Sequence, residues 1–281
     1  MNRSALLLSL AFLAATSTLL GQSSNRANSQ LPVSFKAATN NGASPKPFSK
    51  VALSGGVSLM GVNAQVATNM NRYLNLRGTG NFFNYTANNI STNGFNIDAK
   101  LNMAAAGASL DFYPFPNHGF RLSPGALFYN QNRVSANGSV TSGTSITLND
   151  QTYYSATANA VTGATPISVI GNLGLHTNKQ ALTATTGWGN VIPRKGGHWS
   201  FPVELGAAFI GSPSIGVNLT GWACTDQAQT NCANLASANN AIATQVQTNL
   251  TAQTAKWKSD LDPLKYYPIF SFGLSYNFRV R

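Results

Sequence analysis

The sequence predicts an all-β protein: an antiparallel, transmembrane up-and-down β-barrel of about eight strands, with one amphipathic helix before the last strand. Three observations support this prediction. The last strand, Tyr267–Phe278, alternates large apolar side chains with small polar ones, so it has one face suited to lipid. Charged residues make up only 9% of the chain, against about 25% in a typical soluble domain. The amino terminus has the pattern of an export signal.

Residues 1–22 are expected to be a signal peptide. Arg3 precedes an almost continuous apolar run at 5–20, and small residues follow that run. The run is short for a membrane-spanning helix and no basic cluster follows it, which favours cleavage over a retained anchor. Residues 23–49, rich in Asn, Ser and Pro, are expected to form a flexible leader. Residues 50–281 then form the outer-membrane barrel domain.

Seven further segments show the alternation of a strand that is buried on one face. With the last strand they make eight, and closure into a barrel removes the exposed edges that a membrane forbids. The last strand is expected to close the barrel by pairing with the first. The seven segments are Val51–Gly61, Tyr73–Tyr85, Ala99–Tyr113, Phe120–Phe128, Gln180–Asn190, Trp199–Phe209 and Ile215–Leu219.

Two stretches complicate this count. The alternation changes parity within residues 104–109, which predicts a bulge or an alanine-lined surface there. Residues 130–180 are too long for an ordinary connection, and Ser145–Tyr154 is a candidate strand within them. Two additional strands in this stretch would give ten. With eight strands and both ends of the barrel in the periplasm, the stretch faces the periplasm, although long loops normally lie outside.

Residues 236–262 are predicted to form an amphipathic helix that Pro263 ends. Its apolar stripe consists of Ile242, Val246, Leu250, Trp257, Leu261 and Leu264. The helix is expected to pack against the barrel mouth or to plug the lumen, because the chain must return directly to the last strand. Lysines beside Trp257, namely Lys256, Lys258 and Lys265, leave a helix on the membrane surface as the alternative.

The charge is strongly basic, with a formal net charge of +11. The basic residues are scattered and form no basic helix, so the sequence does not indicate nucleic-acid binding. Attraction to the anionic groups of a bacterial outer surface is the more natural use of this charge. The sequence shows no catalytic set, phosphate loop or metal-ligand spacing, and the three histidines fall in turns or at a strand start. We therefore expect no enzymatic activity, cofactor or metal.

Two groups of residues are candidate sites. Cys224 and Cys232 are the only cysteines, and in an exported protein they are expected to form a disulfide. Strand parity points five charged side chains into the lumen: Arg77, Lys100, Asp111, Arg121 and Glu204. Since an isolated buried charge is costly, Asp111 and Glu204 are expected to pair with two of the basic residues. A structural polar core is favoured because narrow barrels are filled by side chains, and a gated ion path is the alternative.

Several segments resemble a family of small bacterial outer-membrane β-barrel proteins. These segments are Leu110–Phe115, Gly119–Gly125, Gly187–Asn190, Gly211–Pro213, and the predicted helix leading to Tyr266–Pro268 and Phe278. The resemblance implies a location in the outer membrane, contact with its lipid and lipopolysaccharide, and recognition of the last strand by the barrel-assembly machinery. In this family the last strand ends in a terminal Phe, whereas here three residues follow Phe278.

The function expected from these features is that of an outer-membrane barrel with a structural or surface-interaction role and a lumen filled by side chains. One alternative is a narrow porin-like channel for small solutes or ions. The other is a soluble, lipocalin-type ligand-binding barrel, in which the apolar face of each strand would point inward.

Overall fold

The computed structural model describes residues 46–92, 94–116, 118–193 and 197–280. The expected signal peptide and most of the expected leader lie outside the described residues. Within the described part of the chain, no helix is long and apolar enough to cross a membrane.

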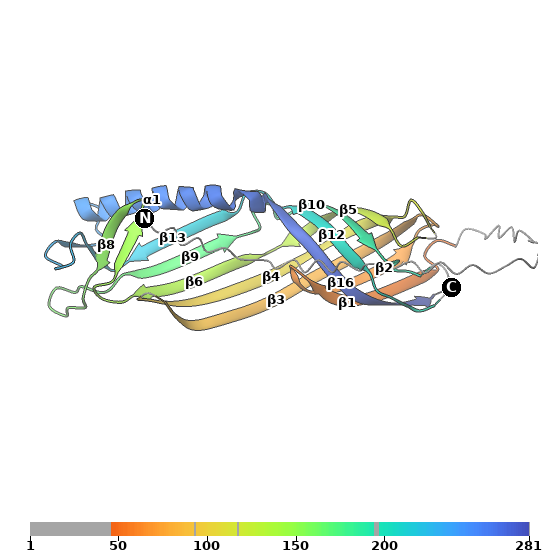
Figure 1. The fold of residues 1–281 in the computed structure, drawn as a ribbon, viewed down its shortest axis with the longest axis horizontal. Helices are drawn as coiled ribbons and strands as arrows, with labels where there is room; N and C mark the ends of the chain where they lie inside the picture. The colour runs from red at the N-terminus through yellow and green to blue at the C-terminus, as the bar shows by residue number, and fades with distance from the viewer. Residues whose placement is uncertain (1–45, 93, 117, 194–196, 281) are drawn as a thin grey trace, which may run out of the picture. The chain divides into compact units, whose positions relative to one another are not determined.

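Eight antiparallel strands form a closed hydrogen-bonded ring, as predicted (Figure 1). The ring runs β4-β3-β2-β1-β16-β12-β10-β5 and returns to β4. The last strand closes onto the first, with Val51 opposite Phe278. The strands of the ring are β1 (Lys50–Ser58), β2 (Gly61–Asn69), β3 (Leu74–Thr92), β4 (Phe95–Phe112), β5 (Arg121–Asn130), β10 (Ala181–Trp188), β12 (Val203–Phe209) and β16 (Tyr266–Arg279). A short strand, β11 (Trp199–Ser200), also pairs with β16.

The number of strands in the ring agrees with the prediction, but the set of strands does not. The segment Gly61–Asn69 was not predicted as a strand, yet it is β2 and pairs with β1 and β3. Conversely, Ile215–Leu219 was assigned to the barrel, and it lies outside the ring as part of β13 (Ser214–Thr220). Alternation alone does not distinguish a strand of the barrel from a strand outside it. An apolar strand face can pack against a protein core as well as face lipid.

The strands β3 and β4 continue beyond the ring. Residues Ala105–Phe112 of β4 pair with β5 inside the ring, whereas Phe95–Asn102 pair with β6 (Arg133–Val140) outside it. From there the sheet extends through β9 (Ser168–Gly174) to β13. Figure 1 shows these strands fanning out from the long β3–β4 pair. The same two strands therefore belong to the barrel at one end and to a second, open sheet at the other.

A four-stranded sheet and a helix accompany this open sheet. The small sheet has the order β15-β14-β8-β7. Its strands are β7 (Ser145–Leu148), β8 (Gln151–Ser155), β14 (Trp222–Cys224) and β15 (Cys232–Asn234). The helix α1 (Ala241–Leu261) is followed by a 3-10 turn, η1 (Asp262–Lys265). The Asn240 side chain caps its first turn by accepting hydrogen bonds from the N–H groups of Ile242 and Ala243. We call the open sheet, the small sheet and α1 together the distal domain.

The helix prediction is confirmed, but its packing partner differs from the expectation. Val246 and Leu250 of α1 are buried in a cluster that also contains Val140 of β6 and Leu219 of β13. Most of the apolar stripe thus covers the open sheet and the small sheet, and its last residue, Leu264, packs against the cluster at the distal end of the barrel, as expected. Ser145–Tyr154 likewise forms the β7–β8 hairpin of the distal domain and adds no strands to the barrel. Trp257, at the far end of the stripe, is exposed.

The corrected strand set removes the conflict over residues 130–180. Lys50 at the start of β1 lies opposite Arg279 at the end of β16, and we call this the terminal end of the barrel. Successive strands of the ring run in opposite directions between the terminal end and the other end, which we call the distal end. Residues 131–180 and 210–265 therefore both leave the barrel at the distal end. The two long connections that build the distal domain therefore lie on one side.

This packing predicts that the distal domain can be loosened while the barrel stays closed. Replacement of the buried Leu250 by Ala removes apolar contact from the centre of the helix interface, which typically costs about 2–5 kcal/mol. In Leu250→Ala we expect faster proteolysis and hydrogen exchange in α1 and β6–β9, with unchanged heat-modifiable migration of the barrel on gels.

The exposed Gln247, one turn away on α1, provides the matched control. Gln247→Ala is expected to behave like the wild type in all three measurements. Equal protection of α1 in Leu250→Ala and the wild type would contradict the proposed packing.

Candidate functional site in the barrel lumen

The outward face of the ring is apolar over its whole height. Large apolar side chains on the eight strands are exposed, and many of them lie opposite each other across strand pairs, for example Leu53 opposite Val66 and Tyr276. Aromatic residues gather at both ends. The terminal rim holds Tyr73, Phe112, Trp188, Trp199, Tyr276 and Phe278, and the distal rim holds Phe82, Phe128, Tyr129, Phe209 and Tyr266. The inward face is polar and charged at mid-height.

Arg77 is the centre of the charged group in the lumen. Its Nε donates to both carboxylate oxygens of Asp111 at 3.1 Å each. Its Nη1 and Nη2 donate to the two carboxylate oxygens of Glu204 at 2.6 and 2.9 Å. All three side chains are buried, with Asp111 fully enclosed. The guanidinium thus makes a two-bond, fork-like contact with Glu204, the arrangement in which arginine binds carboxylate most strongly, and shares one N–H between the two oxygens of Asp111.

The pair Arg77–Glu204 spans the lumen from wall to wall. Arg77 lies on β3 and Glu204 on β12, and these strands are four places apart in either direction around the ring of eight. They are therefore the opposite walls of the barrel. An ion pair of 2.6 Å therefore joins the two walls across the lumen at this level.

Further polar groups complete the cluster. Arg121 Nη2 lies 3.5 Å from Glu204 Oε2, and Arg121 Nη1 donates to the Gly189 carbonyl at 2.6 Å. Asp111 accepts a hydrogen bond of 2.7 Å from Ser123 Oγ, and Glu204 accepts one from Thr185 Oγ1. Two arginines and two carboxylates give a formal charge of zero, so each buried charge has a partner of opposite sign.

A glycine makes room for the second arginine. A Cβ atom at Gly187 of β10 would lie 2.7 Å from Arg121 Cζ, so a larger residue there would displace the guanidinium. Ser123, Thr185 and Gln65, which also contacts Arg77, were not singled out from the sequence. The sequence does place these three residues at the inward-facing positions of β5, β10 and β2. That alone does not single them out, because short polar side chains are common on any polar strand face.

Of the five residues predicted to lie in the lumen, four lie together there and Lys100 lies outside the barrel. Lys100 is exposed and lies opposite Ser135 in the open sheet, so its assignment to the lumen is corrected. The pairing of β4 with β3 is continuous from Phe112 to Ala99, so β4 keeps its parity and Lys100 faces away from Asp111. The register shift falls in the pairing with β5, where Phe128 is the extra residue. Met103 occupies the inward position instead.

Apolar clusters lie above and below the charged group. The distal cluster consists of Met60, Ala105, Leu127, Leu175, Ala181, Ala208 and Ile210. At the terminal end, Val191 and Ile192 from the β10–β12 connection pack against Ala52 and Ala67. Ser275 Oγ fixes this connection by donating to the Val191 carbonyl at 2.9 Å. Both ends of the charged layer are thus covered by side chains.

Small cavities lie among the described residues inside the barrel. One of about 50 Å³ is lined by residues that include Arg77, Asn81 and Thr185, and one of about 10 Å³ adjoins Arg121. Glu204 lines both. The larger has room for a few water molecules and the smaller for about one at most. Neither approaches the several hundred Å³ of a typical ligand pocket.

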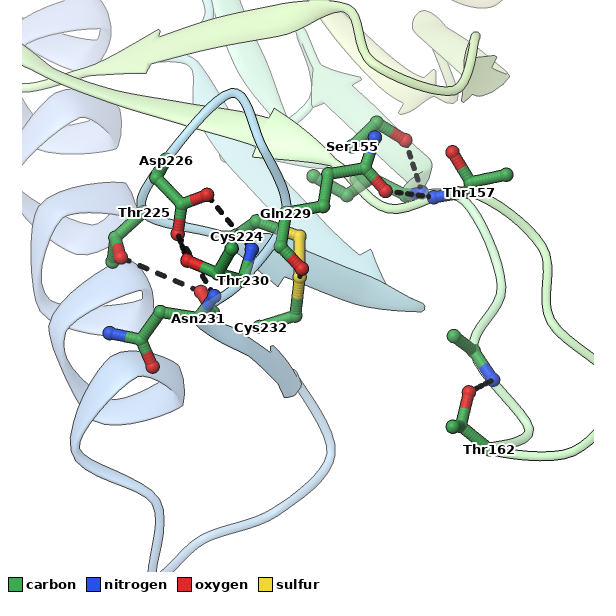
Figure 2. Close-up of a disulfide and its surroundings, with 12 residues drawn as sticks. Ser155, Thr157, Thr162, Cys224, Thr225, Asp226, Gln229, Thr230, Asn231 and Cys232 are labelled. Atoms are coloured by element: carbon green, nitrogen blue, oxygen red, sulfur yellow. Dashed lines mark hydrogen bonds between the residues drawn. A yellow bond between two sulfur atoms is a disulfide. The ribbon is translucent and has the colours of Figure 1, made fainter.

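The predicted disulfide is confirmed and lies in the distal domain (Figure 2). Cys224 of β14 and Cys232 of β15 are bonded and face each other in the small sheet. Between them, the exposed Asp226 accepts hydrogen bonds from Thr230 N and Asn231 N, both at 2.9 Å. These bonds, that from Thr230 above all, lower the pKa of Asp226 below its usual value. The loop is therefore held both covalently and by its own hydrogen bonds.

The fold has counterparts among solved structures. No protein-family model matches this chain, and no curated protein matches its sequence. The crystal structure of CarO from Acinetobacter baumannii aligns with a TM-score of 0.52 and 17% identity, over 83% of this chain and 98% of CarO. CarO2 from the same organism aligns with a TM-score of 0.52 and 18% identity, over 83% of this chain and all of CarO2. The predicted resemblance to small outer-membrane barrels is confirmed at the level of the fold.

The central place of Arg77 predicts a large cost for its removal. Arg77→Met would leave two buried carboxylates without their main partner, and breaking a buried pair in this way typically costs about 3–5 kcal/mol. We expect this variant to unfold at clearly lower denaturant concentration than the wild type, measured by the loss of heat-modifiable migration in urea.

Two further variants make the test specific. Arg72→Met removes an exposed arginine from the β2–β3 turn and is expected to be nearly neutral. Arg77→Met combined with Glu204→Gln removes one of the stranded charges, so it is expected to be less destabilised than Arg77→Met alone. If Arg77→Met unfolded at the same urea concentration as Arg72→Met, the cluster would not stabilise the barrel.

Proposed function

We propose that this chain is an outer-membrane barrel with a closed lumen, and that its role is to hold the distal domain at the cell surface for interactions there. The observation that carries the proposal is the Arg77–Glu204 pair, which joins opposite walls of the ring beneath a folded domain built from both long connections. A barrel that is filled in this way serves as an anchor, and the ordered surface available for contact is the distal domain.

The outward apolar face supports insertion into a membrane. From Tyr266 at the distal rim to Tyr276 at the terminal rim, β16 advances by ten residues. At about 3.3 Å per residue and a tilt of about 40°, this corresponds to a height of roughly 25 Å, the height of the apolar band in outer-membrane barrels. A soluble lipocalin-type barrel would point this face inward, so the exposed position of Leu53, Leu205 and Phe272 speaks against that alternative.

The export route and the remaining partners are inferred from the sequence. Residues 1–22 have the pattern of a signal peptide, and a disulfide suits an oxidising compartment outside the cytoplasm. In the proposed setting the outward face contacts lipid and lipopolysaccharide. The barrel-assembly machinery would recognise β16, whose Phe278 lies at the terminal rim.

The orientation follows from the two long connections. Outer-membrane barrels have short periplasmic turns and longer extracellular loops. Residues 131–180 and 210–265 both emerge at the distal end, so we place that end outside the cell and the terminal end in the periplasm.

A narrow ion path is the second candidate function. The two polar cavities on either side of Glu204 favour it, because they put room for water on both faces of the central ion pair. Conduction would require Arg77 and Glu204 to separate and both apolar clusters to move. The closed barrel needs no such rearrangement, which is why we favour it.

Planar lipid bilayers distinguish these two functions. The wild-type protein is expected to insert without unitary current steps. Glu204→Ala is also expected to be silent, because the apolar clusters at Met60 and Val191 still cover the charged layer. Heat-modifiable migration of the protein recovered from the same lipid verifies insertion.

Current steps from the wild type would overturn the closed-lumen proposal. Current steps from Glu204→Ala alone would show that the ion pair acts as a gate and would favour the second candidate.

The orientation predicts which epitopes intact cells display. A short tag inserted at Val161, which is 96% exposed at a loop tip of the distal domain, is expected to bind antibody on intact cells. The same tag in the β2–β3 turn at Arg72 is expected to bind only after the outer membrane is permeabilised. The reverse pattern would invert the proposed orientation.

A further inference from the structure

A pocket separate from the lumen lies in the distal domain, next to the disulfide. It has a volume of about 320 Å³ and lies between the 156–164 loop and the β14–β15 segment. This volume is within the range of small-molecule sites and exceeds both lumen cavities. Figure 2 shows Thr157 and Thr162 on one side and Gln229 and Cys232 on the other.

Both walls of the pocket are held in place by bonds within the protein. The disulfide and Asp226 fix the segment that carries Gln229 and Thr230. Asn159 Oδ1 accepts hydrogen bonds from Val161 N and Thr162 N, which shapes the opposite loop. The two walls are tied together because Thr157 N donates to Gln229 Oε1 at 2.7 Å. A ligand would therefore meet a largely preformed site, which lowers the entropic cost of binding.

The chemistry of the lining is aromatic and polar but uncharged. Trp222 is half-buried and lines the pocket together with the methyl groups of alanines. Among the described residues that line it, none carries a formal charge. Within the described part of the chain, Gln229 Nε2, Asn159 Nδ2 and Thr157 Oγ1 make no hydrogen bond, so these donors remain available. The pocket thus combines an indole with amide and hydroxyl groups that make no hydrogen bond to the described part of the protein.

We propose that this pocket binds an uncharged sugar. A pyranose ring has apolar C–H faces that pack on an indole and hydroxyl groups that both donate and accept hydrogen bonds, which matches this lining. A charged ligand would lose hydration without gaining a partner of opposite sign. The free sugar and a sugar unit within a polysaccharide share this chemistry.

The site test uses purified full-length protein in lauryldimethylamine oxide, a detergent without a sugar headgroup. The probes are methyl α-glucoside, methyl α-galactoside and N-acetylglucosamine, with glucuronate as the charged comparison and dextran as the polymer. Saturation-transfer NMR and calorimetry measure binding. At least one neutral monosaccharide is expected to bind more tightly than glucuronate, and tighter binding of dextran per sugar unit would point to a polysaccharide as the source.

Two substitutions test the residues. Trp222→Leu removes the indole face and is expected to weaken binding at least about tenfold, which corresponds to about 1.4 kcal/mol. Thr157→Val removes one hydroxyl but keeps the backbone bond to Gln229, and is expected to weaken binding about threefold to tenfold. Trp257→Leu, on the exposed part of α1, is the matched control and is expected to bind as the wild type does.

Three results would overturn the proposal. The first is that no neutral probe binds, and the second is that glucuronate binds more tightly than the neutral probes. The third is that Thr157→Val and Trp222→Leu, as two single variants, both bind the probe as tightly as the wild type does. Hydrogen-exchange protection of α1 and β6–β9 verifies that the distal domain of each variant is folded, and Thr157→Val keeps the test decisive should Trp222→Leu not fold. The experiment is done in detergent, so its failure would leave the proposed membrane anchor and its orientation untouched.

Discussion

Arg77 holds the two opposite walls of the barrel together, and the arrangement of the lumen depends on it. An eight-stranded ring has an interior narrow enough for side chains to meet across it. Arg77 on β3 bonds Asp111 on the neighbouring strand and Glu204 across the lumen, while Arg121 supplies the second positive charge. Buried charges are tolerated here because their number and sign balance and because Ser123, Thr185 and the Gly189 carbonyl hydrogen-bond to them, although Arg121 Nε has no partner among the described residues. The same cluster spans the lumen from β3 to β12.

A second constraint is that the barrel and the distal domain share strands. Because β4 pairs with β5 over one half and with β6 over the other, the sheet leaves the ring without a break in β3 and β4. The open sheet then needs a cover for its apolar face, and α1 with the β7–β8 hairpin provides it. The polar lumen and the apolar core of the distal domain are consequently successive parts of the same long strands.

The residues explain why some predictions failed while others held. The clear alternation of Tyr267–Phe278 and its pairing with the first strand were predictable, because a lipid-facing strand needs apolar residues at every second position. The strand β2 was missed because its outward side has only two large apolar residues, Val62 and Val66, with the small Ala64 between them and Thr68 after them. Lys100 was misplaced because β4 keeps its parity while the polarity of its face changes. The face that carries Asp111 in the lumen carries Leu101 and Met103 farther along the same strand, so Lys100 lies on the opposite, exposed face.

The sequence by itself determined the class of fold, the single helix before the last strand, the disulfide and four of the charged residues that meet in the lumen. Each of these follows from local properties: the period of apolar residues, the chemistry of a side chain, or the cost of leaving a charge alone. Only the tertiary structure decided which strands close the ring, that β13 and α1 lie outside it in the distal domain, and that Trp222 and Gln229 line one pocket. These features depend on which apolar faces meet and on where β4 changes partner, and an alternating strand has the same pattern whether lipid or another layer of protein covers it.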